Sequence, residues 1–293
     1  WALRMIEVIG GRAVHPIACE VGGFKVWPRI SELKNLTDQY ETVLKNALGL
    51  VNFVISIRYP KFSRPTTFVS LTNPKEYALY DGDIKILAPT GQVRIIKAEK
   101  YTQNIKEIEE PYRAAKSATL AGEPFMVGAL ARINNNGEQL NPLAKGLLKG
   151  MRWRLPQYNT FENISAQAIE IVHCLEEAKK ILGDLLGNQL SAETRPTLSL
   201  QAIAGANPLG RETVGVDAIE APRGTLYHHY KIDKNGYLTN CNIITPTVSY
   251  LKNLEQDVLA YIPNLMKLSP KKRSIRIRAL IRAYDPCIAC ATH

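Results

Sequence analysis

The sequence lacks an apolar run long enough to span a bilayer, and it shows no basic and apolar leader of the secretory kind. It is also poor in cysteine, because five cysteines in 293 residues are too few for a disulfide framework. These thiols do not form a set that could hold an iron–sulfur cluster. Unpaired thiols and a missing leader favour a reducing compartment, so we predict a cytoplasmic protein with no membrane span.

The net charge of +10 is high, but the sequence lacks the pattern that nucleic-acid binding requires. The basic residues are mostly scattered, and the one dense run, residues 271–282, has no interleaved aromatic residues. No recognised nucleic-acid module surrounds this run. We therefore predict no nucleic-acid partner, and we interpret the run as a helix that presents cations to a partner subunit or to solvent.

Hydrophobic residues make up 45% and charged residues 22% of the sequence, as in a globular protein with a sizeable core. Apolar residues at helical spacing predict helices over 31–57, 139–153, 161–186, 249–266 and 272–283. Alternation and turn residues predict short strands over 67–71, 77–80 and 84–87, and a hairpin around Asn235-Gly236. The sequence therefore predicts a mainly helical α+β fold with small β-sheets and hairpins.

Several polar residues are predicted to have no site chemistry. Residues 134–137 are predicted to form a plain loop. His173 lies off the apolar stripe of its predicted helix, so we expect it at the rim or exposed. Cys174 and Cys241 are interpreted as small buried hydrophobic residues rather than ligands.

The last nine residues contain a metal-ligand pattern. Cys287 and Cys290 are separated by two residues, His293 follows, and Pro286 restricts the backbone before them. Thiolate is a soft ligand that suits nickel, iron, zinc or copper. Two sulfurs cannot close a four-coordinate site, so further ligands are expected from elsewhere. A structural zinc knuckle and two core thiols without a metal are the alternatives.

A Pro-Arg-Gly turn forms a second group of candidate site residues. The predicted hairpin places Pro222 and Pro246 at its two open ends, where both could face one ligand. Gly224 lets the backbone pass closely and Pro222 restricts it, so the turn would hold the Arg223 guanidinium in a defined direction. The alternative is that Arg223 pairs with Glu220 or with a backbone carbonyl.

The C-x-x-C-x-x-H motif, opened by Asp285-Pro286, resembles the nickel-binding C-terminal motif of the large subunit of nickel–iron hydrogenases. Other stretches resemble the same family: G-G-R-x-x-H-P at 10–16, V-G-x-L-A-R at 127–132, E-x-P-R-G-x-L-x-H at 220–228 and P-T at 246–247. Many members have Trp-Asn or Gln-Asn soon after that threonine, where this sequence has Val248-Ser249-Tyr250. Members also carry an R-x-C-x-x-C motif before the first stretch. We therefore expect residues 1–293 to be a single large-subunit domain that lacks its N-terminal segment.

The resemblance implies a nickel–iron centre with CO and cyanide ligands on the iron. Cys287 would be a terminal nickel thiolate, Cys290 would bridge nickel and iron, and two more thiolates would come from the missing segment. Arg223 would overhang the open metal position and donate toward one cyanide, and Thr247 would donate to a second. Cofactor binding would also involve Pro222 and a dry pocket around the CO ligand, formed by Ala221, Leu226 and Pro246.

The resemblance further implies a catalytic set of Arg223, Asp285 and Cys287. Asp285 would pair with Arg223 and fix its direction, or it would only cap the preceding helix. The Cys287 sulfur or Arg223 would accept the proton. His293 would hold magnesium or iron in a separate site with the backbone carbonyl of Ile243. His228 would orient groups or relay protons, or it would be structural.

The predicted function is the reversible oxidation of H2 to protons and electrons. Because the sequence has no cysteine set for a cluster, electrons would leave through a small subunit with iron–sulfur clusters, and then through further electron-transfer subunits. A separate polypeptide or segment would supply the missing C-x-x-C. The alternatives are a non-catalytic assembly protein derived from a hydrogenase and a zinc-stabilised interaction domain.

Overall fold

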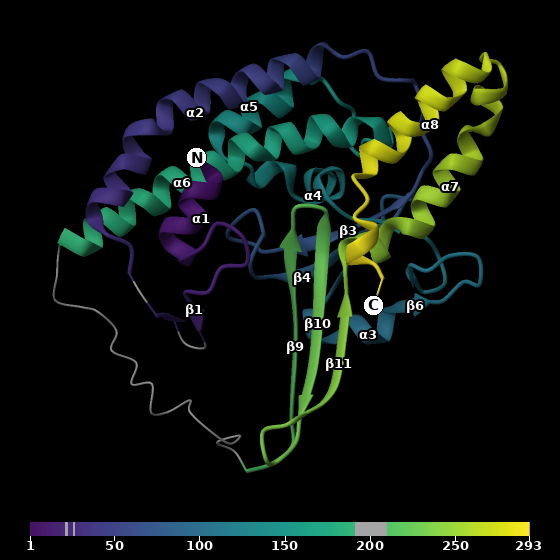
Figure 1. The fold of residues 1–293 in the computed structure, drawn as a ribbon. Helices are drawn as coiled ribbons and strands as arrows, with labels where there is room; N and C mark the ends of the chain where they lie inside the picture. Colours follow the sequence, from purple (N-terminus) through teal and green to yellow (C-terminus); the bar gives the residue numbers. More distant parts are fainter. Residues whose placement is uncertain (21–22, 26, 191–209, 293) are drawn as a thin grey trace.

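The computed structural model describes residues 1–20, 23–25, 27–190 and 210–292. Two long helices, α2 (Ile30–Ser56) and α6 (Asn163–Leu190), pack against each other, and the short α1 (Ala2–Gly10) lies against α2 (Figure 1). The apolar residues of α2 recur every three or four positions, and that face is buried. Its buried residues are Leu33, Leu36, Tyr40, Ala47, Val51 and Val54. The helix predicted over 31–57 is confirmed.

The remaining helices are shorter, and only the last three of them lie in regions where a helix was predicted. They are α3 (Tyr101–Asn104), α4 (Ala129–Asn136), α5 (Pro142–Gly150), α7 (Pro246–Met266) and α8 (Pro270–Tyr284). Single 3₁₀ turns cover Ala98–Lys100, Gly137–Gln139, Thr160–Glu162 and Ile288–Cys290. Helices are therefore confirmed in each predicted region, with ends that differ by a few residues. Across the residues that the structure describes, no helix is both long and apolar enough to cross a membrane.

Two antiparallel pairs and one four-stranded sheet support the helices. The four-stranded sheet has the order β5-β4-β3-β8, with β3 and β8 parallel. Its strands are Val93–Ile96, Asp83–Leu87, Thr67–Thr72 and Phe125–Met126. The pairs are β1 (Cys19–Glu20) with β2 (Gly23–Phe24), and β6 (Ile105–Ile108) with β7 (Ser117–Leu120).

The predicted strands over 67–71 and 84–87 are confirmed, but the strand predicted over 77–80 is wrong. That segment leaves the sheet and runs toward the helices. The Tyr77 hydroxyl donates to Glu170 Oε1 at 2.6 Å, in the buried interior beside α6. Tyr77 and Ala78 are buried there, whereas Tyr80 is exposed.

A three-stranded sheet, in the order β11-β10-β9, projects from the body of the molecule (Figure 1). Its antiparallel strands are Leu238–Ile244, Gly224–Ile232 and Thr213–Ala221. The hairpin around Asn235-Gly236 is confirmed, and Gly236 takes the left-handed conformation with φ 88°. The register pairs Tyr227 with Ile244, so the turn before β10 and the start of α7 lie at the same end of the sheet.

Three smaller predictions are wrong. The expected loop over 134–137 is mostly the end of α4, where Asn135 and Asn136 are buried and donate to Ser70 and Leu71 of β3. His173 is buried, because its Nδ1 accepts from the Asn141 backbone N–H at 3.2 Å and its ring packs edge-on against that of Tyr77.

Cys174 and Cys241, expected to be buried, are both exposed. Cys241 lies on β11 where that strand projects from the body, and Cys174 faces a cavity beside α6.

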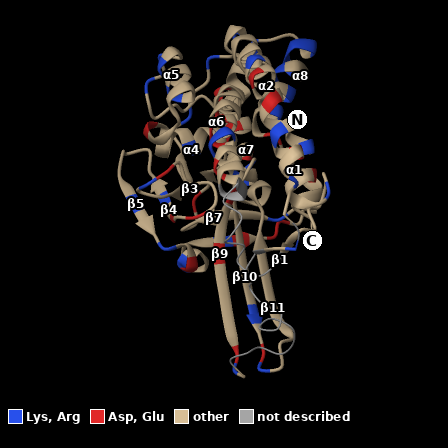
Figure 2. Ribbon diagram, turned by 90° about the vertical axis from the view of Figure 1, so that its left-hand side faces the viewer, with Lys and Arg blue, Asp and Glu red and all other residues tan. Residues whose placement is uncertain are grey.

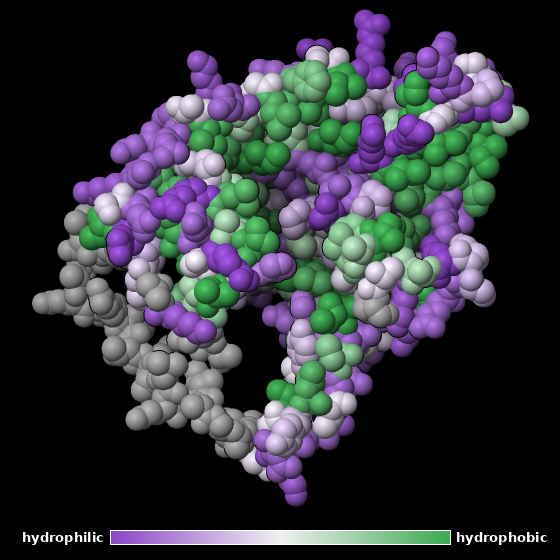
Figure 3. Space-filling view, in the orientation of Figure 1, coloured by the Kyte–Doolittle hydropathy of each residue, from purple (hydrophilic) through white to green (hydrophobic). Residues whose placement is uncertain are grey.

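Helices α7 and α8 carry the chain to its C-terminus and present two kinds of surface. The basic run lies along α8, where most of its cations are exposed (Figure 2). An apolar area lies over α7 (Figure 3), with Leu259, Ile262 and Met266 exposed at 58%, 42% and 61%. A surface that pairs exposed apolar residues with cations is typical of a face that another chain covers.

Candidate metal centre

The C-terminal tail begins where α8 ends. Asp285 adopts the left-handed conformation, with φ 49°, and turns the chain away from the helix axis. Cys287 is half-buried, Cys290 is exposed, and their sulfurs are joined in a disulfide with 5.3 Å between the Cα atoms. After reduction, this spacing would let both sulfurs reach one metal ion.

The donor set of the tail suits a soft metal but is incomplete. Two thiolates fit half of a nickel–iron centre. Nowhere in the described part of the chain do three or more histidine, cysteine, aspartate or glutamate side chains gather as a metal site. The remaining ligands would have to come from outside the described residues. His293, predicted as a ligand of a separate hard cation, also lies outside them.

The Pro222–Arg223 turn meets the tail. Arg223 Nε donates to the carboxylate Oδ2 of Asp285 at 2.9 Å and to the Asp285 carbonyl oxygen at 2.8 Å. The expected contact between these two residues is therefore present. Glu220 does not pair with Arg223, because it is bound to Arg132. Arg223 and Asp285 side chains remain 39% and 49% exposed, so both are accessible from the site.

The N-terminus of α7 forms the third side of the site. Thr247 is buried, and its Oγ1 accepts from the Cys287 backbone N–H at 3.3 Å. The Tyr250 hydroxyl lies 3.2 Å from Thr247 Oγ1 and donates to the Asp285 carbonyl at 3.2 Å. Burial raises the pKa of Tyr250 to about 12, so its hydroxyl keeps its proton at neutral pH. The turn and the start of α7, far apart in the sequence, thus both contact the segment from Asp285 to Cys287.

The other predicted residues flank this point. Ala221 ends β9, Leu226 lies on β10, and both are half-buried, whereas Pro246 is buried at the start of α7. Ile243 pairs with His228 across β11 and β10. The His228 ring nitrogen Nδ1 lies 2.6 Å from the Tyr230 hydroxyl. These positions put the residues on the elements that form the site, without assigning them a role.

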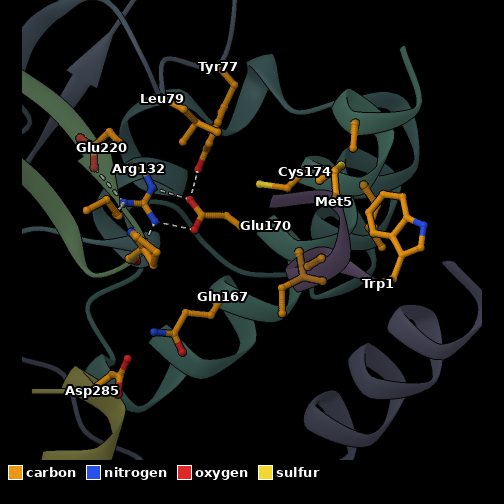
Figure 4. A pocket seen from close by; sticks show the side chains of 16 residues that line it. Trp1, Met5, Tyr77, Leu79, Arg132, Gln167, Glu170, Cys174, Glu220 and Asp285 are labelled. Carbon is orange, nitrogen blue, oxygen red and sulfur yellow. Dashed lines mark hydrogen bonds and ion pairs between the residues drawn. The ribbon is translucent and has the colours of Figure 1, made fainter. Parts of the chain in front are cut away.

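A buried guanidinium fixes the turn from behind. Arg132, on α4, binds both carboxylate oxygens of Glu170 at 2.6 Å and one oxygen of Glu220 at 2.8 Å. It also donates to the carbonyl oxygens of Ala221 and Pro222 at 3.1 and 3.2 Å. Figure 4 shows Arg132 held between the two carboxylates. The backbone of the turn is therefore tied to α4 and α6.

The charges of this network are strongly coupled. Burial lowers the pKa of Arg132, but the carboxylates of Glu170 and Glu220 outweigh it and leave that pKa well above its usual value. Burial raises the pKa of Glu220, and Arg132 offsets this only in part. Arg132 ends the V-G-x-L-A-R stretch that was recognisable in the sequence. Its partners were not, because they lie 38 and 88 residues away.

Two glycines allow the turn to approach the start of α4 closely. Gly224 has φ 137°, and a Cβ there would lie 2.3 Å from Val127 Cγ2. Gly128 has φ 97°, and a Cβ there would lie 3.0 Å from the Arg223 carbonyl oxygen. Only glycine combines such φ values with this close backbone approach. The role predicted for Gly224 is confirmed in this respect.

The end of α8 is anchored by a buried polar cluster. The Tyr284 hydroxyl donates to Asp257 Oδ2 at 2.6 Å, and Asp257 also pairs with Arg64. Asn163 accepts from the Leu130 N–H at 2.9 Å and donates to the Ala283 carbonyl at 2.7 Å. The last turn of α8 is thereby fixed to α7 and to the start of α4, so the tail begins from a rigid point.

A cavity of about 550 Å³ opens beside the site (Figure 4). Its walls are mostly apolar and come from α1, α6 and the Pro222 turn, and it extends from Trp1 to Asp285. Cys174 faces this cavity, and the protein atoms around its side chain desolvate the thiol and raise its pKa to about 11. That thiol is therefore protonated at neutral pH and is a poor metal ligand.

The sequence and the fold both have relatives among hydrogenases. A sequence model described as nickel-dependent hydrogenase matches residues 66–293. The alpha chain of sulfhydrogenase 1 of Pyrococcus furiosus is 30% identical over 99% of this chain, which spans 64% of that protein. A chain of the F420-non-reducing hydrogenase of Methanothermobacter thermautotrophicus is 30% identical over the whole of this chain, which spans 63% of it.

Among solved structures, an NAD⁺-reducing [NiFe]-hydrogenase in its H2-reduced state superposes with a TM-score of 0.82 at 24% identity. That match covers 99% of this chain and 66% of the other. The Ni-Fe-Se hydrogenase of Desulfovibrio vulgaris Hildenborough matches with a TM-score of 0.64 at 20% identity. At these identities the likeness shows the fold, and the large-subunit-like fold expected from the sequence is confirmed.

Proposed function

Because the chain belongs to the nickel-dependent hydrogenase family, we propose that it forms most of a large subunit that catalyses reversible H2 oxidation at a nickel–iron centre. One observation carries this proposal. The Pro222–Arg223 turn, the start of α7 and the tail that carries the two C-terminal thiols meet at one point, although they lie up to 68 residues apart. A structural zinc site requires only its ligands and does not require a guanidinium beside them.

In this proposal Cys287 and Cys290 hold the nickel–iron centre with two thiolates from a separate segment. When bound, the centre supplies the Lewis acid that polarises H2. The Cys287 sulfur accepts the proton. Arg223 is cationic at ordinary pH, so it acts first as an electrostatic stabiliser and only secondarily as a base. Asp285 keeps the guanidinium directed over the site.

The remaining residues bind and enclose the cofactor in the same proposal. Thr247 would donate to one cyanide ligand when its hydroxyl hydrogen is free, and Arg223 would donate to the other. Ala221, Pro222, Leu226 and Pro246 exclude water around the CO ligand. His293 and the Ile243 carbonyl hold magnesium or iron near the chain end.

The partners follow from two features of the described residues, the separation of their free cysteines and their exposed apolar and basic surface. Electrons would pass to an iron–sulfur subunit, because the free cysteines among the described residues, Cys19, Cys174 and Cys241, lie on separate elements. The apolar area of α7 and the cations of α8 offer a face for a partner. The cavity from Trp1 to Asp285 would accommodate a segment that carries the other two thiolates, next to the start of the tail. We propose a cytoplasmic location for the complex.

Elemental analysis and infrared spectroscopy of the purified complex test the proposed function. We expect nickel and iron in comparable amounts, with bands in the region where metal-bound CO and cyanide absorb. Zinc alone would instead identify an interaction domain. A nickel-replete complex without those bands would contradict the proposal, and a complex with neither metal would identify a non-catalytic assembly protein.

Replacing Arg223 by Lys should reduce turnover by about 10–100-fold while nickel and iron contents stay unchanged. Lysine keeps the charge but loses the planar fork that reaches Asp285 and the site together. The loss corresponds to one well-placed electrostatic contact in the transition state. Steady-state H2 oxidation and metal analysis of the same preparation measure both quantities. Loss of nickel in this variant would show that Arg223 is structural.

A further inference from the structure

The hydroxyl hydrogens at the start of α7 can be assigned from the hydrogen bonds alone. A carbonyl oxygen only accepts, so Tyr250 must donate its single hydrogen to the Asp285 carbonyl. In the 3.2 Å contact between Tyr250 and Thr247, Thr247 is then the donor. Thr247 Oγ1 also accepts from the Cys287 N–H. The chain of hydrogen bonds therefore runs from Cys287 through Thr247 and Tyr250 to Asp285.

In this series of hydrogen bonds the Thr247 hydroxyl both donates and accepts. Thr247 and Tyr250 are buried at 1% exposure each, so solvent does not supply other partners. The Tyr250 ring is also fixed, because it packs 5.3 Å from the ring of Tyr284. The Asp285 carbonyl oxygen accepts from Arg223 as well, so each of its two lone pairs has a donor.

We propose that Tyr250 is a positioning residue that competes with the iron-bound ligand for the Thr247 hydroxyl hydrogen. While Tyr250 donates to Asp285, Thr247 donates to Tyr250 and not toward the metal site. This inference rests on the proposed function and deepens it, because it names what limits donation by Thr247. It also gives a role to a residue at which this sequence departs from the common family pattern.

Replacing Tyr250 by Phe tests the proposal with little change in volume. In the purified complex, the freed Thr247 hydroxyl should donate to its ligand, so one cyanide band should shift while nickel and iron contents stay unchanged. Adding Thr247→Ala to Tyr250→Phe should abolish that shift, because the donor is gone. Tyr261→Phe is the matched control, since Tyr261 is a buried tyrosine of the same helix in the core between Phe62 and Phe161.

No shift in Tyr250→Phe, or a shift that persists after Thr247→Ala is added, would overturn the competition. A merely structural role of Tyr250 would not produce a shift that depends on Thr247.

Hydrogen–deuterium exchange of the same complexes gives a readout that needs no cyanide. The Cys287 amide should exchange about fivefold faster in Tyr250→Phe, as expected when one ordinary hydrogen bond is lost from the chain that holds it. It should be unchanged in Tyr261→Phe. Equal exchange rates in all three proteins would overturn the positioning role even if the complex proved to be a hydrogenase. If the complex showed no cyanide bands but the Cys287 amide still exchanged faster in Tyr250→Phe, the result would contradict the proposed function and not the positioning role of Tyr250.

Discussion

Replacing Arg132 by Met is expected to destabilise the fold by about 3–5 kcal/mol, the usual cost of removing one partner from a buried ion pair. Arg132 is 2% exposed and neutralises two carboxylates, and the Glu220 side chain is fully buried. Methionine would leave both acids without a counterion and the carbonyls of Ala221 and Pro222 without a donor. Thermal unfolding and soluble yield of the complex measure the loss.

A graded series of arginines supplies the control. Arg113, paired with Glu110 and Glu255, is 15% exposed, and Arg4, paired with Glu7 and Glu32, is 52% exposed. Replacement by Met should cost less at Arg113 than at Arg132, and at most about 1 kcal/mol at Arg4. Equal losses at Arg132 and Arg4 would show that the network contributes no special stability.

The loss at Arg132 should also depend on pH. Burial raises the pKa of Glu220, and Arg132 is the main group that lowers it. Without Arg132 that pKa rises further, so the folded variant binds a proton that the unfolded chain binds only at lower pH. Its stability should therefore recover as the pH falls from alkaline values toward the carboxyl pKa of the unfolded chain. A deficit that grows on acidification would contradict this.

Replacing Cys290 by Ser should reduce both nickel and iron to background levels and abolish H2 oxidation. A serine hydroxyl is a hard ligand with a much higher pKa than a thiol, so it cannot replace a bridging thiolate. Elemental analysis of the purified complex measures the two metals directly.

Two other cysteines provide matched controls for this substitution. Cys174→Ser and Cys241→Ser should keep wild-type metal contents, because one thiol faces the cavity beside α6 and the other lies on the projecting sheet. Wild-type nickel in Cys290→Ser, or metal loss in all three variants, would argue against the assigned ligands.

The sequence indicated the parts of the candidate site whose chemistry is local. Cys287, Cys290 and the Arg223 turn are recognisable because residue type and spacing carry the information. The contact between Arg223 and Asp285 was also predicted, because the resemblance to the family implied it. The helices were predictable for a similar reason, because an apolar stripe identifies a buried helix face whatever it packs against.

Errors occurred where a distant partner decides the environment. Tyr77 looked like a strand residue and His173 like a rim residue, yet each is buried because Glu170 or Asn141 lies opposite. Arg132 and Tyr250 belong to the site only through residues far along the chain. A single sequence does not contain these pairings, so neither the ion-pair network nor the hydroxyl chain could be predicted.

The tail turns away from α8 at the left-handed Asp285, so the length of α8 decides the direction in which the tail leaves the helix. Each helical residue turns the chain by about 100° and advances it by about 1.5 Å, so adding one residue to α8 would swing the tail to another side of the helix. The thiols would then face away from Arg223, although every side chain of the site would still be present. Length changes should therefore be tolerated at the exposed Asn235-Gly236 turn but not between Pro270 and Cys287. Whether the site can assemble therefore depends on the angular position at which α8 ends, as much as on the identity of the metal ligands.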